Sequence, residues 1–324
     1  MSIAFIFPGR GSQSSGMLHQ LLDHPEVDRT LDEISEVLRS DVRQLNSDQS
    51  PDLTVPMQIA LLAAGVATAR ALMEQRVDPA AVSGFSVGAF SAAVTAGVLS
   101  LKDAVALVKL RAEQTMKLYP NGYGLSAIVG LNESQVTKIV KAVTSVQHPV
   151  FVGNINAPRQ IVIAGSNVAM DQVLEEARRK GASKALRLHV SVPWHCPLLQ
   201  PVADLLGKRM SSVNLTEPRL IYVGNVNARA IRTKEAVARD LVNNIAHGVR
   251  WHDATTVLQE LGCNLFLEMP PGHSLSDLAK ENLTDINSVP VEANASLRVL
   301  RLAQMQNAND GAPPIDPHGG VQAV

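Results

Sequence analysis

A chain of 324 residues, 46% of them hydrophobic and 18% charged, can bury a substantial core and has the composition of a soluble globular protein. Its 29 Lys and Arg nearly balance its 30 Asp and Glu, so charge gives no reason to expect a nucleic-acid or membrane-surface partner. The two cysteines, Cys196 and Cys263, have no paired spacing, which fits a reducing cytoplasm and argues against a disulfide framework or a zinc module. The histidine spacing suggests no metal site either.

The first 120 residues have the pattern of an α/β domain. Residues 3–7 form a short apolar run that ends at a Pro-Gly pair, and we expect a buried parallel strand there rather than a signal peptide. Helical patterns follow over 17–45, about 55–76 and 101–119; the second is rich in alanine and suited to burial against a sheet. No apolar run approaches the length that spans a membrane, and we expect a cytoplasmic protein.

Between the second and third helices lies Gly84-Phe85-Ser86-Val87-Gly88, which reads Gly-x-Ser-x-Gly. The pentapeptide alone also occurs in Gly- and Ser-rich loops. Here an apolar run precedes it and a helix-compatible segment follows it. Strand, sharp turn and helix in this order predict a nucleophile elbow, which presents a serine hydroxyl at the top of a sheet.

The loop at 9–13, Gly-Arg-Gly-Ser-Gln, has a phosphate cradle as its rival interpretation. The third glycine of a Gly-x-Gly-x-x-Gly motif would fall at Ser14, and no Walker lysine follows. We therefore expect this loop to offer backbone N–H groups beside the elbow instead of binding a dinucleotide.

From about residue 120 the pattern changes to alternating short strands and helices in the order β-α-β-β-α-β, which is that of a ferredoxin-like unit. We expect these elements at 124–129, 133–143, 150–155, 160–164, 170–180 and 185–190. The sequence thus predicts a ferredoxin-like subdomain at 121–189, inserted into a core that comprises 1–120 and 190–302.

The larger domain resumes with a Pro-rich loop around His195. A helix to about residue 210, a strand at 220–224, helices at 234–245 and 251–261, and a final clear strand at 264–268 follow. We expect the tail at 303–324 to be disordered, because it is polar and rich in Asn, Gly and Pro.

A serine hydroxyl needs a base that removes its proton. Among the nine histidines, His195 is the first candidate because Pro193 and Pro197 hold its loop, and His273 is the second. From the residues alone, His195 has a plain alternative as a partly exposed loop histidine. Arg111 likewise has a plain alternative, since most helix arginines are solvated.

Six motifs taken together resemble a known family. They are Phe7-Pro8-Gly9-Arg10-Gly11-Ser12-Gln13, Gly84-Phe85-Ser86-Val87-Gly88, Leu110-Arg111, Asn156-Ala157-Pro158, Val192-Pro193-Trp194-His195-Cys196-Pro197-Leu198 and Glu268-Met269-Pro270-Pro271-Gly272. In this order the chain resembles the malonyl-CoA:acyl-carrier-protein transacylases over roughly its first three hundred residues. The resemblance implies an α/β fold with an α/β-hydrolase-like parallel-sheet core and a ferredoxin-like insertion.

The resemblance also implies roles for individual residues. Ser86 would be the nucleophile and His195 its general base, a Ser-His dyad. Arg111 would hold the free carboxylate of the malonyl group, a task that suits a guanidinium because it pairs bidentately and stays charged. Asn244 stands where the family usually has glutamine, whose backbone carbonyl orients the histidine.

The oxyanion hole would consist of the backbone N–H groups of Val87 and Arg10. Three positions depart from the family pattern, which usually has glutamine at Arg10, histidine at Phe85 and glutamate at Ala89. A backbone donor survives the change at Arg10. The apolar elbow is more like that of the epsilon subunit of bacterial malonate decarboxylase, a transacylase of the same type.

These features predict an acyltransferase that moves a malonyl group from malonyl-CoA, through a Ser86 ester, to the prosthetic-group thiol of an acyl carrier protein. We expect malonyl-CoA as substrate, no bound cofactor, and the malonate decarboxylase carrier and other subunits of that enzyme as partners. Three alternatives stay open: a malonyl transacylase of fatty-acid or polyketide synthesis, a serine thioesterase on the same fold, and a non-catalytic subunit that docks the carrier.

Overall fold

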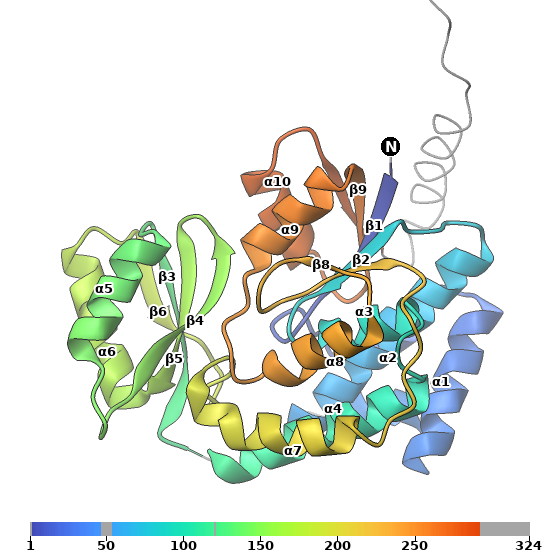
Figure 1. The fold of residues 1–324 in the computed structure, drawn as a ribbon, viewed down its shortest axis with the longest axis horizontal. Helices are drawn as coiled ribbons and strands as arrows, with labels where there is room; N and C mark the ends of the chain where they lie inside the picture. Colours follow the sequence, from blue (N-terminus) through green and yellow to red (C-terminus); the bar gives the residue numbers. More distant parts are fainter. Residues whose placement is uncertain (1, 47–53, 120, 292–324) are drawn as a thin grey trace, which may run out of the picture.

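The computed structural model describes residues 2–46, 54–119 and 121–291. Figure 1 shows a larger part, in which helices cover a central sheet, beside a smaller part built on a second sheet. The predicted disordered tail at 303–324 lies outside the described residues.

The central sheet has six strands in the order β10-β9-β1-β2-β7-β8. They are β1 (Ser2–Phe7), β2 (Ala81–Gly84), β7 (Ile221–Val223), β8 (Ala230–Ile231), β9 (Cys263–Glu268) and β10 (Asn287–Pro290). The first five in this order run parallel, and β8 pairs antiparallel with β7 at the edge. The predicted α/β fold with a parallel sheet is therefore confirmed.

The side chains of β1 alternate between two apolar cores, as the pleat of a strand requires. Phe5 and Phe7 belong to the core beneath α2 (Thr54–Glu74) and α3 (Gly88–Thr95). Ala4 and Ile6 belong to the core beneath α9 (Trp251–Glu260) and α10 (Ser274–Asn282). Because both faces are covered, β1 reads as an unbroken apolar run.

Helix α2 is long and apolar enough to cross a membrane by length and composition alone, and no other described helix is. However, 78% of its most apolar window is buried within the fold. It packs against α1 (Pro25–Leu38), α3 and α4 (Leu101–Leu118), so it is a core helix. Among the described residues of the larger part, the remaining α-helices are α7 (Gln200–Met210) and α8 (Lys234–Asn243).

The helix predicted over 17–45 is wrong as a single element. The structure divides it into a 3-10 turn, η1 (Met17–His19), then α1, then a second turn, η2 (Val42–Asn46). Helix α1 starts afresh because Pro25 occupies its first turn and the His24 side chain accepts a hydrogen bond from the Glu26 N–H at 3.2 Å. It ends where Arg39 takes the left-handed conformation, with φ of 56°.

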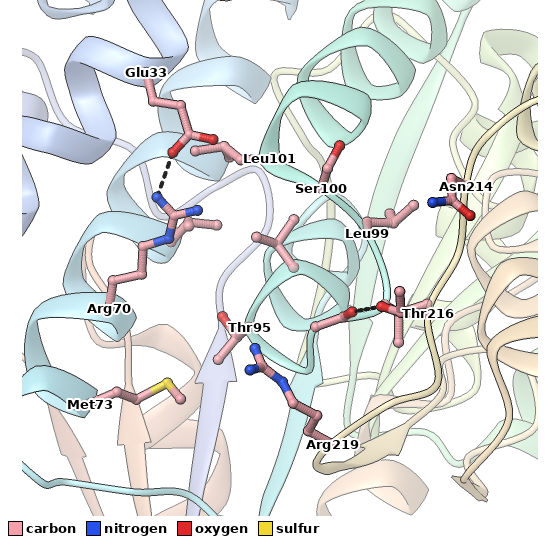
Figure 2. A pocket seen from close by; sticks show the side chains of 14 residues that line it. Glu33, Arg70, Met73, Thr95, Leu99, Ser100, Leu101, Asn214, Thr216 and Arg219 are labelled. Carbon is pink, nitrogen blue, oxygen red and sulfur yellow. Dashed lines mark hydrogen bonds and ion pairs between the residues drawn. The ribbon is translucent and has the colours of Figure 1, made fainter.

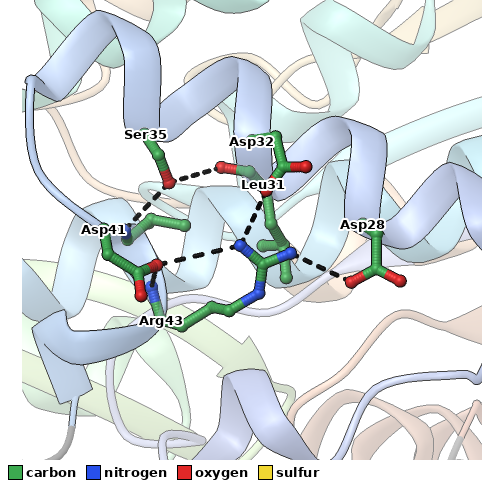
Figure 3. Close-up of polar contacts among 7 residues, drawn as sticks. Asp28, Leu31, Asp32, Ser35, Asp41 and Arg43 are labelled. Carbon is green, nitrogen blue, oxygen red and sulfur yellow. Dashed lines mark hydrogen bonds and ion pairs between the residues drawn. The ribbon is translucent and has the colours of Figure 1, made fainter.

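Arg43 then ties η2 back onto α1, as Figure 3 shows. Its guanidinium donates to Asp32 at 2.8 Å and to Asp28 at 2.9 Å. The Ser35 hydroxyl accepts from the Val42 N–H at 3.0 Å. Exposed ion pairs contribute only about 0–1 kcal/mol each, so this group fixes the course of the chain more than it stabilises the fold.

The smaller sheet has four strands in the order β4-β5-β3-β6, all paired antiparallel. Its elements are β3 (Tyr123–Val129), α5 (Glu133–Val143), β4 (Val150–Ala157), β5 (Gln160–Ser166), α6 (Asn167–Arg179) and β6 (Lys184–Arg187). The predicted order β-α-β-β-α-β is present. That residues 121–189 form an inserted ferredoxin-like subdomain within a core of 1–120 and 190–302 stays a prediction.

The smaller part has its own apolar core between its sheet and α5 and α6. The opposite face of the sheet contributes Leu125, Val162 and Ala164 to the main core. A bridge between Asn154 and Val249 joins the two parts. This face of the smaller sheet therefore lies over the larger domain.

Candidate active site

The Gly-x-Ser-x-Gly motif lies where the sequence predicts it, between β2 and α3. Ser86 is in the left-handed region with φ of 57° and is 8% exposed. A Cβ on Gly84 would come within 2.0 Å of the Gly88 carbonyl oxygen, and a Cβ on Gly88 within 2.3 Å of that of Phe7. Only glycine fits these two positions, which is why strand and helix can turn so sharply around the serine.

His195 lies directly beside Ser86, with 2.7 Å between its Nε2 and the serine Oγ. On the other side of the ring, Nδ1 is 2.6 Å from the Asn244 carbonyl oxygen. A carbonyl oxygen only accepts, so Nδ1 carries the proton and Nε2 is free to accept one from the serine hydroxyl. The unprotonated Nε2 therefore faces the Ser86 hydroxyl as a hydrogen-bond acceptor.

The surroundings of His195 keep it neutral. Burial lowers its pKa to about 3, the positive charge of Arg111 contributes to the same shift, and the bond to the Asn244 carbonyl opposes it. The imidazole is accordingly unprotonated near neutral pH, the form that accepts a proton.

Arg111 projects from α4 into the same site and is 2% exposed. Its guanidinium donates to the Ser86 Oγ at 2.9 Å and to the amide oxygen of Gln58. The Trp194 ring stacks on it, with 4.7 Å from Cζ to the ring centre. Burial, with a smaller effect from Arg10, lowers the pKa of Arg111 to about 9, so it remains charged near neutral pH.

Asn225 is a site residue that the sequence did not reveal. Its side-chain oxygen accepts from the Ser86 N–H at 3.1 Å, and its amide nitrogen donates to the Gly84 carbonyl at 2.7 Å. The buried Asp240 carboxylate in turn accepts from the Asn225 N–H at 3.0 Å. Asn225 follows β7, the strand next to β2. In the sequence, the feature that could have revealed it is a polar residue directly after a predicted strand, at the edge of the sheet where ligands bind.

Gln58 and Trp194 were also missed as contacts of Arg111. Gln58 is a fully buried polar residue in the otherwise apolar stretch of α2, which was a sign of a polar partner. The side chain of Asn244 has no hydrogen-bond partner in the described part of the chain. It meets His195 through its backbone alone, as the resemblance implied.

The loop with Arg10 lies against the elbow: a Cβ on Gly9 would come within 2.6 Å of the Phe85 carbonyl oxygen. Val87 is the residue from which α3 starts, so its N–H belongs to the positive end of that helix. Both residues are therefore close to Ser86. Their role as oxyanion-hole donors stays a prediction.

A cavity of about 310 Å³ opens in front of Ser86, between the larger domain and the smaller sheet. Ser86, His195, Arg111 and Arg10 line it from one side. The smaller part and the segment that follows it contribute Leu125, Asn154, Asn156, Val162, Leu188, His189 and Val190. His273, the second candidate base, does not line this cavity; its exposed side chain lies 2.6 Å from the Asp277 carboxylate.

A larger cavity of about 470 Å³ lies elsewhere, at the start of α4. Figure 2 shows the ion pair between Arg70 and Glu33 at one of its walls, with Arg219 at another. Its lining, within the described residues, contains neither histidine nor cysteine. Of these two cavities, the smaller is the one whose described lining contains both a serine and a histidine.

No group of three or more His, Cys, Asp or Glu side chains within 2–46, 54–119 and 121–291 is arranged to hold a metal ion. The chemistry that the described residues offer is that of a serine activated by a neutral imidazole next to a buried cation.

Comparison with known proteins agrees with this geometry. The model of the acyl transferase domain family matches residues 4–302. The malonyl CoA-acyl carrier protein transacylase of Salmonella typhimurium is 35% identical over 303 residues, 91% of this chain and 97% of that protein. The protein of the same name from Bacillus subtilis is 31% identical over 315 residues, 96% and 99% of the two chains.

Solved structures give the same result. An acyl carrier protein S-malonyltransferase from Vibrio cholerae superposes with a TM-score of 0.88 at 34% identity, covering 93% of this chain and all of that one. A malonyl-transacylase in complex with a type II PKS acyl-carrier protein has a TM-score of 0.88 at 34% identity and covers 95% of this chain. The chain belongs to the malonyl-CoA:acyl-carrier-protein transacylase family of acyl transferases.

Proposed function

We propose that this protein transfers a malonyl group from malonyl-CoA to the thiol of an acyl carrier protein through an ester on Ser86. The observation that carries the proposal is that the Ser86 hydroxyl contacts both His195 and Arg111. The Ser86 Oγ lies 2.7 Å from the Nε2 of a neutral His195 and 2.9 Å from the guanidinium of Arg111. Base and carboxylate-binding cation thus meet at the same nucleophile.

In the first half-reaction, the Ser86 Oγ attacks the thioester carbonyl while its proton passes to His195 Nε2. The N–H groups of Val87 and Arg10 stabilise the negative oxygen of the tetrahedral intermediate. The carbon–sulfur bond then breaks, and the CoA thiolate takes the proton from the imidazolium. The Asn244 carbonyl holds the ring in place and stabilises the charged form.

In the second half-reaction, the thiol of the carrier protein gives its proton to His195 and attacks the malonyl-Ser86 ester. The carbon–oxygen bond breaks, and the serine oxygen takes the proton back from the imidazolium. No acidic side chain contacts the ring among the described residues; a dyad is sufficient because the third group need only orient the base.

Arg111 selects the acyl group. A buried guanidinium without a carboxylate partner is costly, and the malonyl carboxylate supplies the missing charge in a bidentate pair. This pocket favours malonyl transfer over the activity of a typical thioesterase. A malonyl group carries a free carboxylate that can pair with Arg111, whereas a long acyl chain carries no charge there.

For the carrier, the relatives point to the alternative rather than to the first expectation. They bear the names of acyl carrier protein transacylases, and one structure contains a type II PKS acyl-carrier protein. They do not support the malonate decarboxylase carrier. We therefore propose a carrier protein of fatty-acid or polyketide synthesis as the acceptor. The carrier of malonate decarboxylase is the alternative acceptor to be tested beside it.

The test is malonyl transfer with the purified protein and separate holo carriers of both kinds. We expect a stoichiometric burst of free CoA, then transfer to the fatty-acid or polyketide carrier, with little hydrolysis. Hydrolysis of malonyl-CoA that persists with carrier present would favour a thioesterase. Carrier binding without a CoA burst would favour a docking subunit, and exclusive use of the decarboxylase carrier would restore the first expectation.

A further inference from the structure

Arg10 places a second guanidinium in the Ser86 cavity, beyond the backbone role considered above. Within the described part of the chain, its side chain makes one hydrogen bond, from Nη1 to the Thr54 hydroxyl, at a long 3.4 Å. Its Nε is buried and has no partner there. A guanidinium carries five N–H donors, so most of those on Arg10 are not used by the described residues.

The α2 residues that the two arginines contact show how near the arginines are to each other. Arg10 contacts Thr54, and Arg111 contacts Gln58. These α2 residues are four apart and therefore lie on one face of the helix, with Cβ atoms about 5–6 Å apart. The two arginine side chains thus contact successive turns of the same helix, and both residues line the same cavity.

Two like charges this close call for an anion. Burial is the main cause of the lowered pKa of Arg111, and the nearby positive charge of Arg10 is the second cause. None of the described residues that line the cavity is Asp or Glu. A substrate carboxylate would supply the compensating charge that these described residues lack.

We propose that Arg10 and Arg111 together bind the free carboxylate of the acyl group, and that Arg10 is a specificity-determining residue for dicarboxylic acyl thioesters. This inference rests on the proposed function. A carboxylate has two oxygens with about four lone-pair sites, enough for donors from both guanidinium groups. Arg111 already shares its donors with Ser86 and Gln58, which leaves room for a second contributor.

The other anions near such a site are the phosphates of CoA. The acyl carboxylate is favoured because the Arg10 Nε is buried on the cavity wall that also carries Ser86, whereas the phosphates lie beyond the pantetheine arm. A third possibility, general stabilisation of the oxyanion by the Arg10 charge, acts on every acyl group alike. The three effects differ in their dependence on substrate.

The experiment compares wild type with Arg10→Gln, which keeps the backbone N–H, on malonyl-CoA, acetyl-CoA and the malonyl thioester of N-acetylcysteamine, which has no phosphate. We expect kcat/KM to fall about 10- to 100-fold on both malonyl substrates and to change little on acetyl-CoA, because one charge-assisted contact is lost. Arg10→Lys should restore part of the malonyl activity. Arg219→Gln, at the other cavity, is the matched control.

A loss on both CoA esters but not on the N-acetylcysteamine thioester would assign Arg10 to phosphate binding. An equal loss on all three substrates would assign it to the oxyanion, and unchanged kinetics would leave it without a role; each result overturns the inference. If wild type loads no malonyl group, the proposed function itself fails. If wild type loads malonyl but Arg10→Gln keeps the malonyl-to-acetyl ratio, only the role of Arg10 fails.

Discussion

Asn225 offers the sharpest test of how the elbow is held. The side chain makes two buried hydrogen bonds to the turn, accepting from the Ser86 N–H at 3.1 Å and donating to the Gly84 carbonyl at 2.7 Å. Asn225→Ala leaves both backbone groups without these partners, each at a cost of about 1–3 kcal/mol. We therefore expect a loss of about 2–6 kcal/mol, divided between the stability of the fold and the geometry of Ser86.

The part that concerns Ser86 can be separated from the part that concerns folding. If the bond to the Ser86 N–H alone supports the transition state, kcat falls about 5- to 150-fold. KM for malonyl-CoA changes little, because Arg111 keeps its place. Asn225→Asp retains an acceptor for the Ser86 N–H but loses the donor to Gly84, so we expect a smaller fall in kcat than for alanine.

The assay is a steady-state malonyl transfer in parallel with urea unfolding of each variant. Asn227→Ala, an exposed position two residues further along the same loop, is the control. If Asn225→Ala lowered the unfolding free energy but left kcat within about twofold of wild type, the residue would be structural only and the reasoning wrong.

Three further outcomes follow from the same structure. Arg111→Gln removes a positive charge that lowers the pKa of His195, so the acid limb of the pH profile of kcat/KM with acetyl-CoA should move to higher pH. The limb should stay below the ordinary pKa of imidazole, because burial is the larger cause of the shift. An unmoved limb would contradict this coupling. Asn244→Leu should keep kcat/KM near that of wild type, because only the backbone carbonyl contacts His195, whereas loss of activity in a folded variant would give the side chain a role. Burial raises the pKa of Glu268 from 4.5 to about 7, so the folded protein holds this proton more tightly than the unfolded chain does. The contribution of Glu268 to stability therefore falls as pH rises between these two values. Glu268→Gln should flatten this segment of the profile of unfolding free energy against pH, measured by urea unfolding; an unchanged slope would be the contrary result.

Much of the fold was predictable because its elements carry strong local patterns. The apolar run of β1, the helices α4 and α9, and the six elements of the smaller part lie close to their predicted positions. Helix α10 and the edge strand β10 were not predicted, since β10 is short, polar and ends in proline. The two breaks around α1 depend on a cap and a left-handed residue, which hydrophobic spacing does not register.

The site residues likewise include some that the sequence predicts and some that only the tertiary structure reveals. Ser86, His195 and Arg111 could be named from motifs, although Ser86 is 25 positions from Arg111 and 109 from His195. Asn225 and Gln58 could not, because their roles exist only once β7 lies beside β2 and α2 beside α4. The epsilon-subunit expectation rested on Phe85 and Ala89. In the structure Phe85 packs edge-to-face on Trp251 and Ala89 is fully buried, so both serve the packing of the elbow.

The covalent intermediate is the most direct test of the central claim. Protein incubated with malonyl-CoA in the absence of carrier is digested and its peptides are analysed by mass spectrometry. We predict the mass increase of one malonyl group on the peptide that contains Ser86, its disappearance when holo carrier is added, and its absence from Ser86→Ala. A malonyl group that labels the Ser86→Ala protein to the same extent, or no label on wild type in the absence of carrier, would contradict the mechanism.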